Sequence, residues 1–183
     1  MRTVALRVVA LALLLLLALV AALTLRTLER LPDVTVYLVR SDEHSFTLEP
    51  VYRRVRAVDA AAADGAHQVV RGVRAAVEAL VAGPEQSEAA RGLSSAVPEG
   101  TRVLSVAFDA GLVTIDLSRE FVAGGGTASM LGRLHQVRFS AVRPNAVEAV
   151  ALRVEGEPLR VLGGEGIMVD EVWRPSTQEL PRW

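Results

Sequence analysis

The first apolar stretch of the chain has no polar face. Residues 8–25 carry no charge, and Arg2, Arg7, Arg26 and Arg30 flank them. Eighteen helical residues at a rise of 1.5 Å span about 27 Å, close to a bilayer hydrocarbon core of roughly 30 Å. A helix of a soluble domain would instead show an apolar stripe and a polar face. We therefore predict one N-terminal transmembrane helix that anchors the protein, within residues 1–30.

Two alternatives concern this segment. The small residues at positions 20–22 offer a weak signal-peptide cleavage site, although the apolar run is longer than export needs. Arginine is balanced across the segment, so the free amino group and the short leading end favour an N-terminus inside the cell. We expect a single-pass protein of the cell membrane with its domain on the extracytoplasmic side. The rival topology keeps that domain in the cytoplasm.

After the anchor, the pattern changes to short alternating segments and two helical ones. Residues 33–40 and 51–56 are rich in β-branched and aromatic side chains and predict two strands. Apolar residues recur at helical spacing from Val69 to Val81, and Gly83-Pro84 is typical of a helix end. The polar residues 41–49 and the Gly- and Pro-containing residues 85–100 predict loops.

The second half predicts a hairpin, a helix and two strands. Residues 101–108 and 113–118 alternate about a turn at Asp109-Ala110-Gly111, which indicates a β-hairpin. A glycine run at 124–126 predicts a flexible hinge before a helix that Pro144 ends. Residues 146–155 and 159–162 predict the last strands.

This order of elements predicts an α+β domain with a single mixed β-sheet and two helices packed on one face, preceded by the transmembrane helix. The domain covers residues 31–163, and residues 164–183 form a C-terminal tail. The positions that we expect to be buried are Val73, Val77, Leu104, Ile115, Leu134 and Leu152.

Composition excludes several kinds of chemistry. The sequence has no Cys and no Lys, so it lacks disulfides, thiolate nucleophiles, a lipid-modified cysteine and a phosphate-loop lysine. From residue 31 onward, 16 Arg face 20 Asp and Glu residues, a net formal charge of −4. A net acidic domain binds phosphate poorly, so we expect no nucleic-acid partner.

No motif indicates catalysis. His44, His67 and His135 match no metal-binding spacing, and we interpret them as surface or helix-flanking residues. Asp109 fits a turn, while Asp116 and Glu120 fit the end of a strand and the start of a loop. We therefore expect a protein that is not an enzyme, with no catalytic, cofactor or metal site.

The strand at 51–56 offers one candidate interaction surface. Alternation places Tyr52, Arg54 and Arg56 on one side, with Val51, Arg53 and Val55 on the side that faces the helices. Tyrosine and arginine are enriched at binding hot spots. An ordinary solvated sheet face is the alternative interpretation.

Several short motifs, in order, resemble the GerMN domain of sporulation and spore-germination proteins. They occur at residues 36–38, 50–51, 79–84 (Ala-Leu-Val-Ala-Gly-Pro), 97–101, 104–106, 113–118 and 150–156. The resemblance covers residues 34–162. It implies a scaffold without motif-borne catalytic residues, similar to envelope modules that are tethered by a lipid or a membrane helix and that bind or assemble, some of them into rings. This chain departs from that pattern in lacking a lipid-attachment Cys and in showing one copy of the domain, so the resemblance does not imply a sporulation role.

Two functions follow as hypotheses. The first is a non-catalytic, membrane-anchored binding or assembly domain of the cell envelope, with a protein partner or a second copy of itself. The alternative is a module that binds peptidoglycan or another cell-wall glycan. Glycan sites usually need stacking rings, and the chain offers few candidates, Tyr37, Tyr52, Trp173 and Trp183, which argues against this alternative.

Overall fold

The computed structural model describes residues 16–17, 33–42, 45–54, 65–142, 146–163, 166–175 and 180–183. Within those residues, no helix is long and apolar enough to cross a bilayer. Apart from Leu16 and Leu17, the predicted membrane anchor lies outside the described residues, as do His44, Val55, Arg56 and Pro144. The chain divides into two compact units, Met1–Pro32 and Asp33–Trp183. The second unit is described by itself below.

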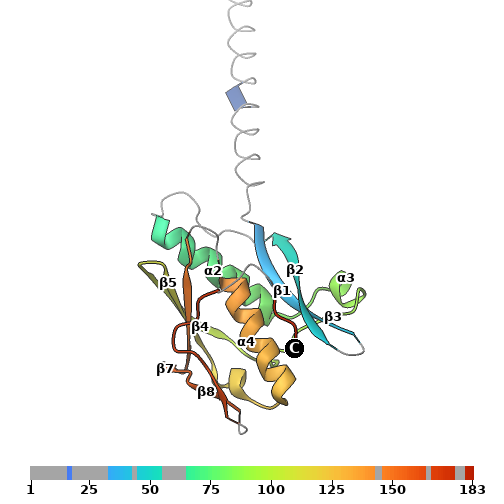
Figure 1. Cartoon of the computed structure of the whole chain (residues 1–183). Coiled ribbons are helices and arrows are strands. Elements are labelled where there is room, and N and C mark those ends of the chain that lie inside the picture. Colours follow the sequence, from blue (N-terminus) through green and yellow to red (C-terminus); the bar gives the residue numbers. More distant parts are fainter. Residues whose placement is uncertain are drawn as a thin grey trace, which may run out of the picture. The chain divides into compact units, whose positions relative to one another are not determined.

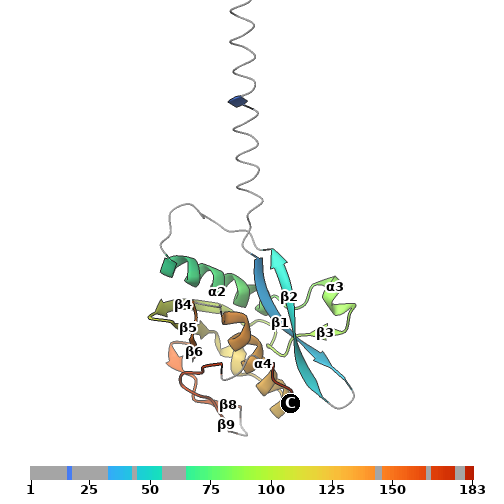
Figure 2. The same ribbon diagram turned by 45° about the horizontal axis from the view of Figure 1, so that its top comes forward.

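Among the described residues, two main sheets and two long helices build this unit, and Figures 1 and 2 show their arrangement. The elements run β1 Asp33–Ser41, β2 Phe46–Arg54, α2 Gly65–Val81, α3 Gln86–Ala89, β3 Leu93–Ser94, β4 Val103–Asp109, β5 Leu112–Leu117, η1 Arg119–Val122 (a 3-10 helix), α4 Thr127–Ala141, β6 Ala149–Val154, β7 Glu157–Pro158, β8 Val161–Leu162 and β9 Ile167–Met168. One sheet has the strand order β2-β1-β3, and the second has β4-β5-β6-β7. Strands β8 and β9 form a small separate hairpin.

One apolar core joins both sheets to both helices. Helix α2 contacts β1 and β4, and helix α4 contacts α2 and β1. Val36 of β1, Val77 of α2, Ile115 of β5 and Val137 of α4 are all fully buried in the same cluster. The α+β prediction is therefore confirmed, and the helical spacing of residues 69–81 and 130–141 identified the buried faces of both long helices.

The prediction of a single sheet is wrong, because helix α4 takes the place of a strand beside β1. The N–H of Tyr37 donates to Ser140 Oγ at 3.0 Å, and the Tyr37 carbonyl accepts a hydrogen bond from Gln136 Nε2 at 2.9 Å. Gln136 and Ser140 lie one helical turn apart, so they reach the same main-chain residue. Because both main-chain groups of Tyr37 bond to side chains of α4, this part of the β1 edge is covered by a helix. The strands after Thr101 form a second sheet.

Leu104 is 40 % exposed, so its predicted burial is also wrong. The register of the β4–β5 pairing shifts between Val103 and Ser105, as at a β-bulge. A bulge adds one residue to a strand and changes which side chains face the core. Val106 and Phe108 keep the expected inward side, whereas Leu104 is turned outward. The other five positions predicted to be buried are confirmed at 4 % exposure or less.

Two predicted loops contain regular structure. Strand β2 begins at Phe46, inside the polar stretch 41–49. Helix α3 and strand β3 lie within residues 85–100, and a capping box between Glu85 and Glu88 starts α3. The start of β2 is polar, and α3 and β3 are short, so hydrophobic periodicity did not detect these three segments.

The predicted tail contributes to both sheets. Trp173 exchanges two main-chain hydrogen bonds with Val150 of β6, at 2.8 and 2.9 Å. Trp183 does the same with Phe46 of β2, at 2.9 and 3.3 Å. We call residues 169–175 and 180–183 the C-terminal strap. Its two tryptophans join a group of rings beside α4 that includes His135 and Phe139.

Candidate functional site

The predicted interaction surface is present on β2 as far as the described residues extend. Tyr52 is 77 % exposed and Arg54 is exposed, whereas Val51 and Arg53 are buried on the opposite side. Thr35 of β1 faces Tyr52 across the strand pair. We call Thr35, Tyr52 and Arg54 the β2 outer face. The alternation predicted from the sequence is therefore confirmed at residues 51–54, and a binding role for the face stays a prediction.

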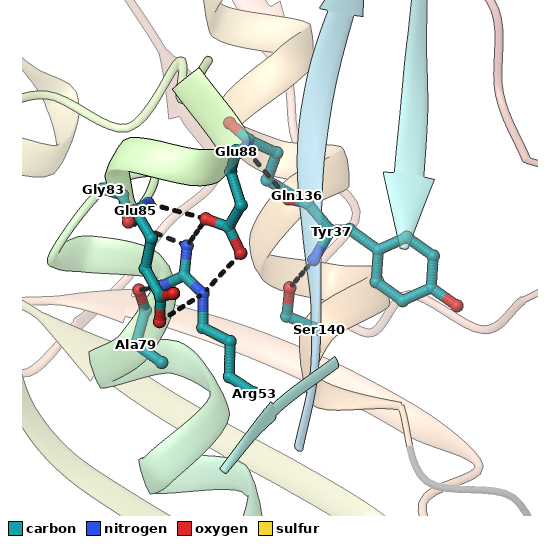
Figure 3. Close-up of polar contacts among 8 residues, drawn as sticks. All are labelled: Tyr37, Arg53, Ala79, Gly83, Glu85, Glu88, Gln136 and Ser140. Carbon is teal, nitrogen blue, oxygen red and sulfur yellow. Dashed lines mark hydrogen bonds and ion pairs between the residues drawn. The ribbon is translucent and has the colours of Figure 1, made fainter. Parts of the chain in front are cut away.

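A buried ion pair lies directly behind this face. The guanidinium of Arg53 contacts both carboxylate oxygens of Glu88, with Nε 3.0 Å from Oε1 (Figure 3). Arg53 also donates to the carbonyl of Ala79 at 2.5 Å and to that of Gly83 at 2.9 Å. Ala79 lies in the last turn of α2 and Gly83 just after the helix end, where main-chain acceptors lack helical partners. One arginine therefore joins β2, the end of α2 and α3.

Glu88 also accepts a hydrogen bond from the main chain at the start of its own helix, α3. Its Oε2 accepts the Glu85 N–H at 2.6 Å. Burial alone raises the pKa of the Glu88 carboxyl, but hydrogen bonds from Arg53 and Glu85 and the charges of Arg53 and Arg91 outweigh it, so the pKa lies below its usual value. The pair therefore holds its charges at neutral pH and fixes the strand that carries Tyr52.

A second surface feature, which the sequence did not indicate, is an open pocket of about 490 Å³ beside the start of α4. We call it the α4 pocket. Its apolar wall comes from Val39 of β1, Phe46 of β2 and Trp183 of the strap. The rings of Phe46 and Trp183 are stacked, with centroids 6.2 Å apart and planes 19° from parallel. Three segments distant in sequence therefore share one wall, which is why no local motif predicted it.

Small and hydroxyl-bearing residues form the rest of the α4 pocket. They are Ser94, Ser95 and Ala96, at and after β3, and residues 126–129 (Gly-Thr-Ala-Ser) at the start of α4. Among the described residues that line it, none has a charged side chain. Within the described structure, the N-cap residue Gly126 makes no side-chain capping hydrogen bond, and the first N–H groups of α4 have no acceptor within the helix.

The glycine run predicted as a flexible hinge is held by Arg133. This side chain is 2 % exposed and donates to the carbonyls of Phe121, Ala123 and Gly124 at 2.7 to 3.0 Å. Gly125 has φ +87°, and a Cβ there would lie 2.6 Å from a guanidinium nitrogen. A glycine is thus required for this close approach, and the loop conformation is explained without a ligand.

The candidate catalytic groups are not brought together. Asp116 accepts the Gly156 N–H at 3.0 Å and so fixes the turn after β6. His67 is exposed, and His135 lies half-buried among rings, 5.2 Å from that of Trp183. Burial, and then the charge of Arg138, lower the pKa of His135. In the part of the chain that is described, no group of three acidic or histidine side chains could hold a metal ion.

The fold and its ordered motifs define a small α+β domain of the GerMN type. The chain belongs to the Germane family, described as sporulation and spore germination, whose model matches residues 35–160. The resemblance noted in the sequence is therefore confirmed. A comparison with curated proteins gives no match. The matched residues include the β2 outer face and most of the α4 pocket, whereas the C-terminal strap lies beyond them.

Solved structures of two bacterial proteins share the fold. The first GerMN domain of the Bacillus subtilis sporulation protein GerM has a TM-score of 0.59 and 15 % identity, covering 79 % of this chain and 98 % of that one. The tandem GerMN domains of the same protein give 0.55 and 20 %, covering 79 % and 45 %. A predicted lipoprotein from Clostridium perfringens gives 0.52 and 17 %, covering 78 % and 86 %. At these identities the likeness establishes the fold alone.

Proposed function

We propose that this protein is a non-catalytic binding or assembly domain of the cell envelope, anchored by its N-terminal segment with the domain on the extracytoplasmic side. Membership of the Germane family over residues 35–160 supports this role. GerM is a sporulation protein, and the Clostridium relative is predicted to be a lipoprotein. The uncharged residues 8–25 supply an anchor that needs no lipid-modified cysteine.

We assign the contact with a protein partner, or with a second copy of the domain, to the β2 outer face. The observation that carries this assignment is the 77 % exposure of Tyr52 on a strand whose other side is fixed by the buried Arg53. A rigid exposed ring next to a guanidinium loses little conformational entropy on binding. Arg56, two residues further on, extends the same alternation in sequence and belongs to the assignment.

Binding through side chains suits this strand better than addition of a further strand to its edge. The N–H and carbonyl of Phe46 pair with Trp183, away from β1. The β1–β2 register is continuous, so the main-chain groups of Leu48, Pro50 and Tyr52 also point away from β1. Pro50 has no N–H and interrupts any ladder there, as is common on edge strands. The face of β2, rather than its edge, is therefore the proposed contact.

A photo-crosslinking amino acid placed at residue 52 of the full chain in intact cells tests the contact. Met168 is the matched control, since it is 78 % exposed on the separate β8–β9 hairpin. We expect a discrete protein adduct, or a cross-linked dimer, from position 52 and none from position 168. The double variant Arg54→Glu/Arg56→Glu should lose the adduct, while circular dichroism shows that the domain stays folded. Equal labelling from both positions, or an adduct that survives the double variant, would show that the face is ordinary surface.

The anchor is tested separately. A periplasmic reporter fused after Trp183 should be active, and the full chain should fractionate with membranes. Deletion of residues 8–25 should release the protein from the membrane fraction. A reporter active only in the cytoplasm would contradict the proposed orientation, and a soluble mature protein that begins near Leu23 would contradict the anchor while leaving export intact.

A further inference from the structure

The α4 pocket has the composition of a site for a small uncharged ligand. Its lining combines apolar side chains, one of them a large ring, with hydroxyl groups and the main-chain N–H groups of a helix start. Small-molecule sites commonly combine such an apolar surface with a few polar groups that set orientation. A phosphate or carboxylate would find no cationic side chain among the described lining residues, and a hydrocarbon would make no use of the hydroxyl groups that line the pocket.

Trp183 is held so that its ring can serve as a fixed wall. Its indole N–H donates to the carbonyl of Ala128 at 3.0 Å, and its main chain pairs with Phe46. The ring also packs against Gly132, where a Cβ would lie 3.2 Å from the indole. A ring fixed at three points offers contact area at little entropic cost on binding.

The other lining residues bring hydroxyl groups that can hydrogen-bond a ligand. Ser94 and Thr127 are exposed, and Ser95 and Ser129 are half-buried. The first turn of α4 adds N–H groups that lack intrahelical acceptors. A pyranose ring presents an apolar face of C–H groups together with a rim of hydroxyls, and an acetamido group adds a carbonyl acceptor and a small methyl.

We propose that the α4 pocket binds a neutral, N-acetylated saccharide, with the sugar face on Trp183 and its polar rim toward Ser94, Ser95 and Thr127. This goes beyond the proposed protein contact, because the α4 pocket and the β2 outer face share no residue. The sugar comes either from a soluble oligosaccharide or from a polymeric wall glycan, and the two sources present the same chemistry to the pocket.

The test uses the full chain in a zwitterionic detergent without a sugar headgroup and the N-acetylglucosamine trimer as probe. The chain has two tryptophans, so Trp173→Phe leaves Trp183 as the only fluorescent indole. We expect a saturable change in Trp183 emission below about 10 mM probe, corresponding to a millimolar or tighter Kd. Amide shifts in NMR spectra should locate to residues 94–96 and 126–129. No saturable change, or shifts confined to other residues, would overturn the proposal.

Two variants separate binding from folding. Trp183→Ala, followed by amide shifts, should weaken binding about tenfold or more, the equivalent of about 1.4 kcal/mol. Trp183→Phe keeps a ring in the wall and should bind within a few-fold of the parent, which controls for loss of the strap. Thr127→Val removes one exposed hydroxyl and should also weaken binding. Unchanged affinity in Trp183→Ala would contradict the site.

Cosedimentation with purified peptidoglycan distinguishes the sources. Sedimentation that the trimer competes away indicates a wall glycan, and trimer binding without sedimentation indicates a soluble saccharide. Tyr52→Ala should leave trimer binding intact, so failure of the protein contact and failure of the saccharide site are independent outcomes. Sedimentation that depends on Tyr52 and not on Trp183 would assign glycan binding to the β2 outer face and reject the pocket.

Discussion

Arg53 and Glu88 form an ion pair in which both side chains are less than a tenth exposed, 7 % and 6 %. The strand residue reaches past the end of α2 to the first turn of α3, and it also contacts Glu85 at 3.8 Å. Because Tyr52 and Arg54 flank Arg53 in β2, the pair also holds the proposed contact face in position.

Replacement of Glu88 by Gln should lower the free energy of unfolding by about 3–5 kcal/mol at pH 7, because it leaves the buried Arg53 with only the distant carboxylate of Glu85. Chemical denaturation measures this loss. Arg40→Gln is a matched control, since its pair with Glu49 is 40 % and 29 % exposed and should contribute about 1 kcal/mol or less. Similar losses in the two variants would contradict a special role for the buried pair.

The pH dependence of stability should report the same carboxylate. The pKa of Glu88 is lowered in the folded protein from a usual value of 4.5, so its contribution is complete above that value. This contribution to stability is lost as pH falls from about 4.5 through the pKa that Glu88 has in the folded protein. The reason is that the carboxyl takes up its proton at a higher pH in the unfolded chain. The stability of Glu88→Gln should therefore fall less steeply than that of the wild type below pH 4.5. Parallel curves would contradict the lowered pKa.

His135 should add a second pH-dependent step. Burial and Arg138 lower its pKa from 6.5, so the folded state resists protonation that the unfolded chain accepts. Stability should decrease as pH falls below about 6.5, and melting temperatures measured from pH 7.5 to 5 should show a flatter profile for His135→Gln. His44 and His67 are unchanged in both proteins, so the difference isolates His135. Identical profiles would show that its protonation is not linked to folding.

Two substitutions by Asp compare a correct and an incorrect burial prediction. Val77 is fully buried, so Val77→Asp should unfold the domain, since an unpaired buried charge costs several kcal/mol. Leu104 is 40 % exposed, and Leu104→Asp should change stability by about 0.5 kcal/mol or less. Circular dichroism with thermal melting distinguishes these outcomes. A stable Val77→Asp protein would mean that α2 presents a different face to the core.

Gln136 should be as important to the arrangement of the sheets as any apolar core residue. Its amide accepts from Ala96 N–H at 2.7 Å and donates to the Tyr37 carbonyl. Gln136→Leu leaves two main-chain groups without partners and should cost about 2–6 kcal/mol, at 1–3 kcal/mol each. Gln86→Leu, at an exposed position of α3, is the control and should be nearly neutral. Equal melting temperatures for the two variants would contradict this role for Gln136.

Local patterns in the sequence determined those elements in which the spacing of apolar residues shows which side chains are buried. The spacing of Val73, Val77 and Leu80 defined the buried stripe of α2, and alternation in β2 correctly separated Tyr52 from Arg53. Each of these inferences depends only on the 3.6- or 2-residue period of the backbone. The ordered motifs also identified the family, because they occur at the ends of these same elements.

Tertiary structure alone decided how the elements pair and where the α4 pocket lies. Tyr37 lies beside α4 because Gln136 and Ser140 satisfy its main chain, and Leu104 is exposed because a bulge shifts β4. Trp183 lines a pocket with Val39 and Ser94, residues about 90 to 140 positions away in sequence. Hydrogen bonds and ring contacts of this kind depend on which segments lie side by side in the folded chain. The pattern of residues along the sequence does not show this.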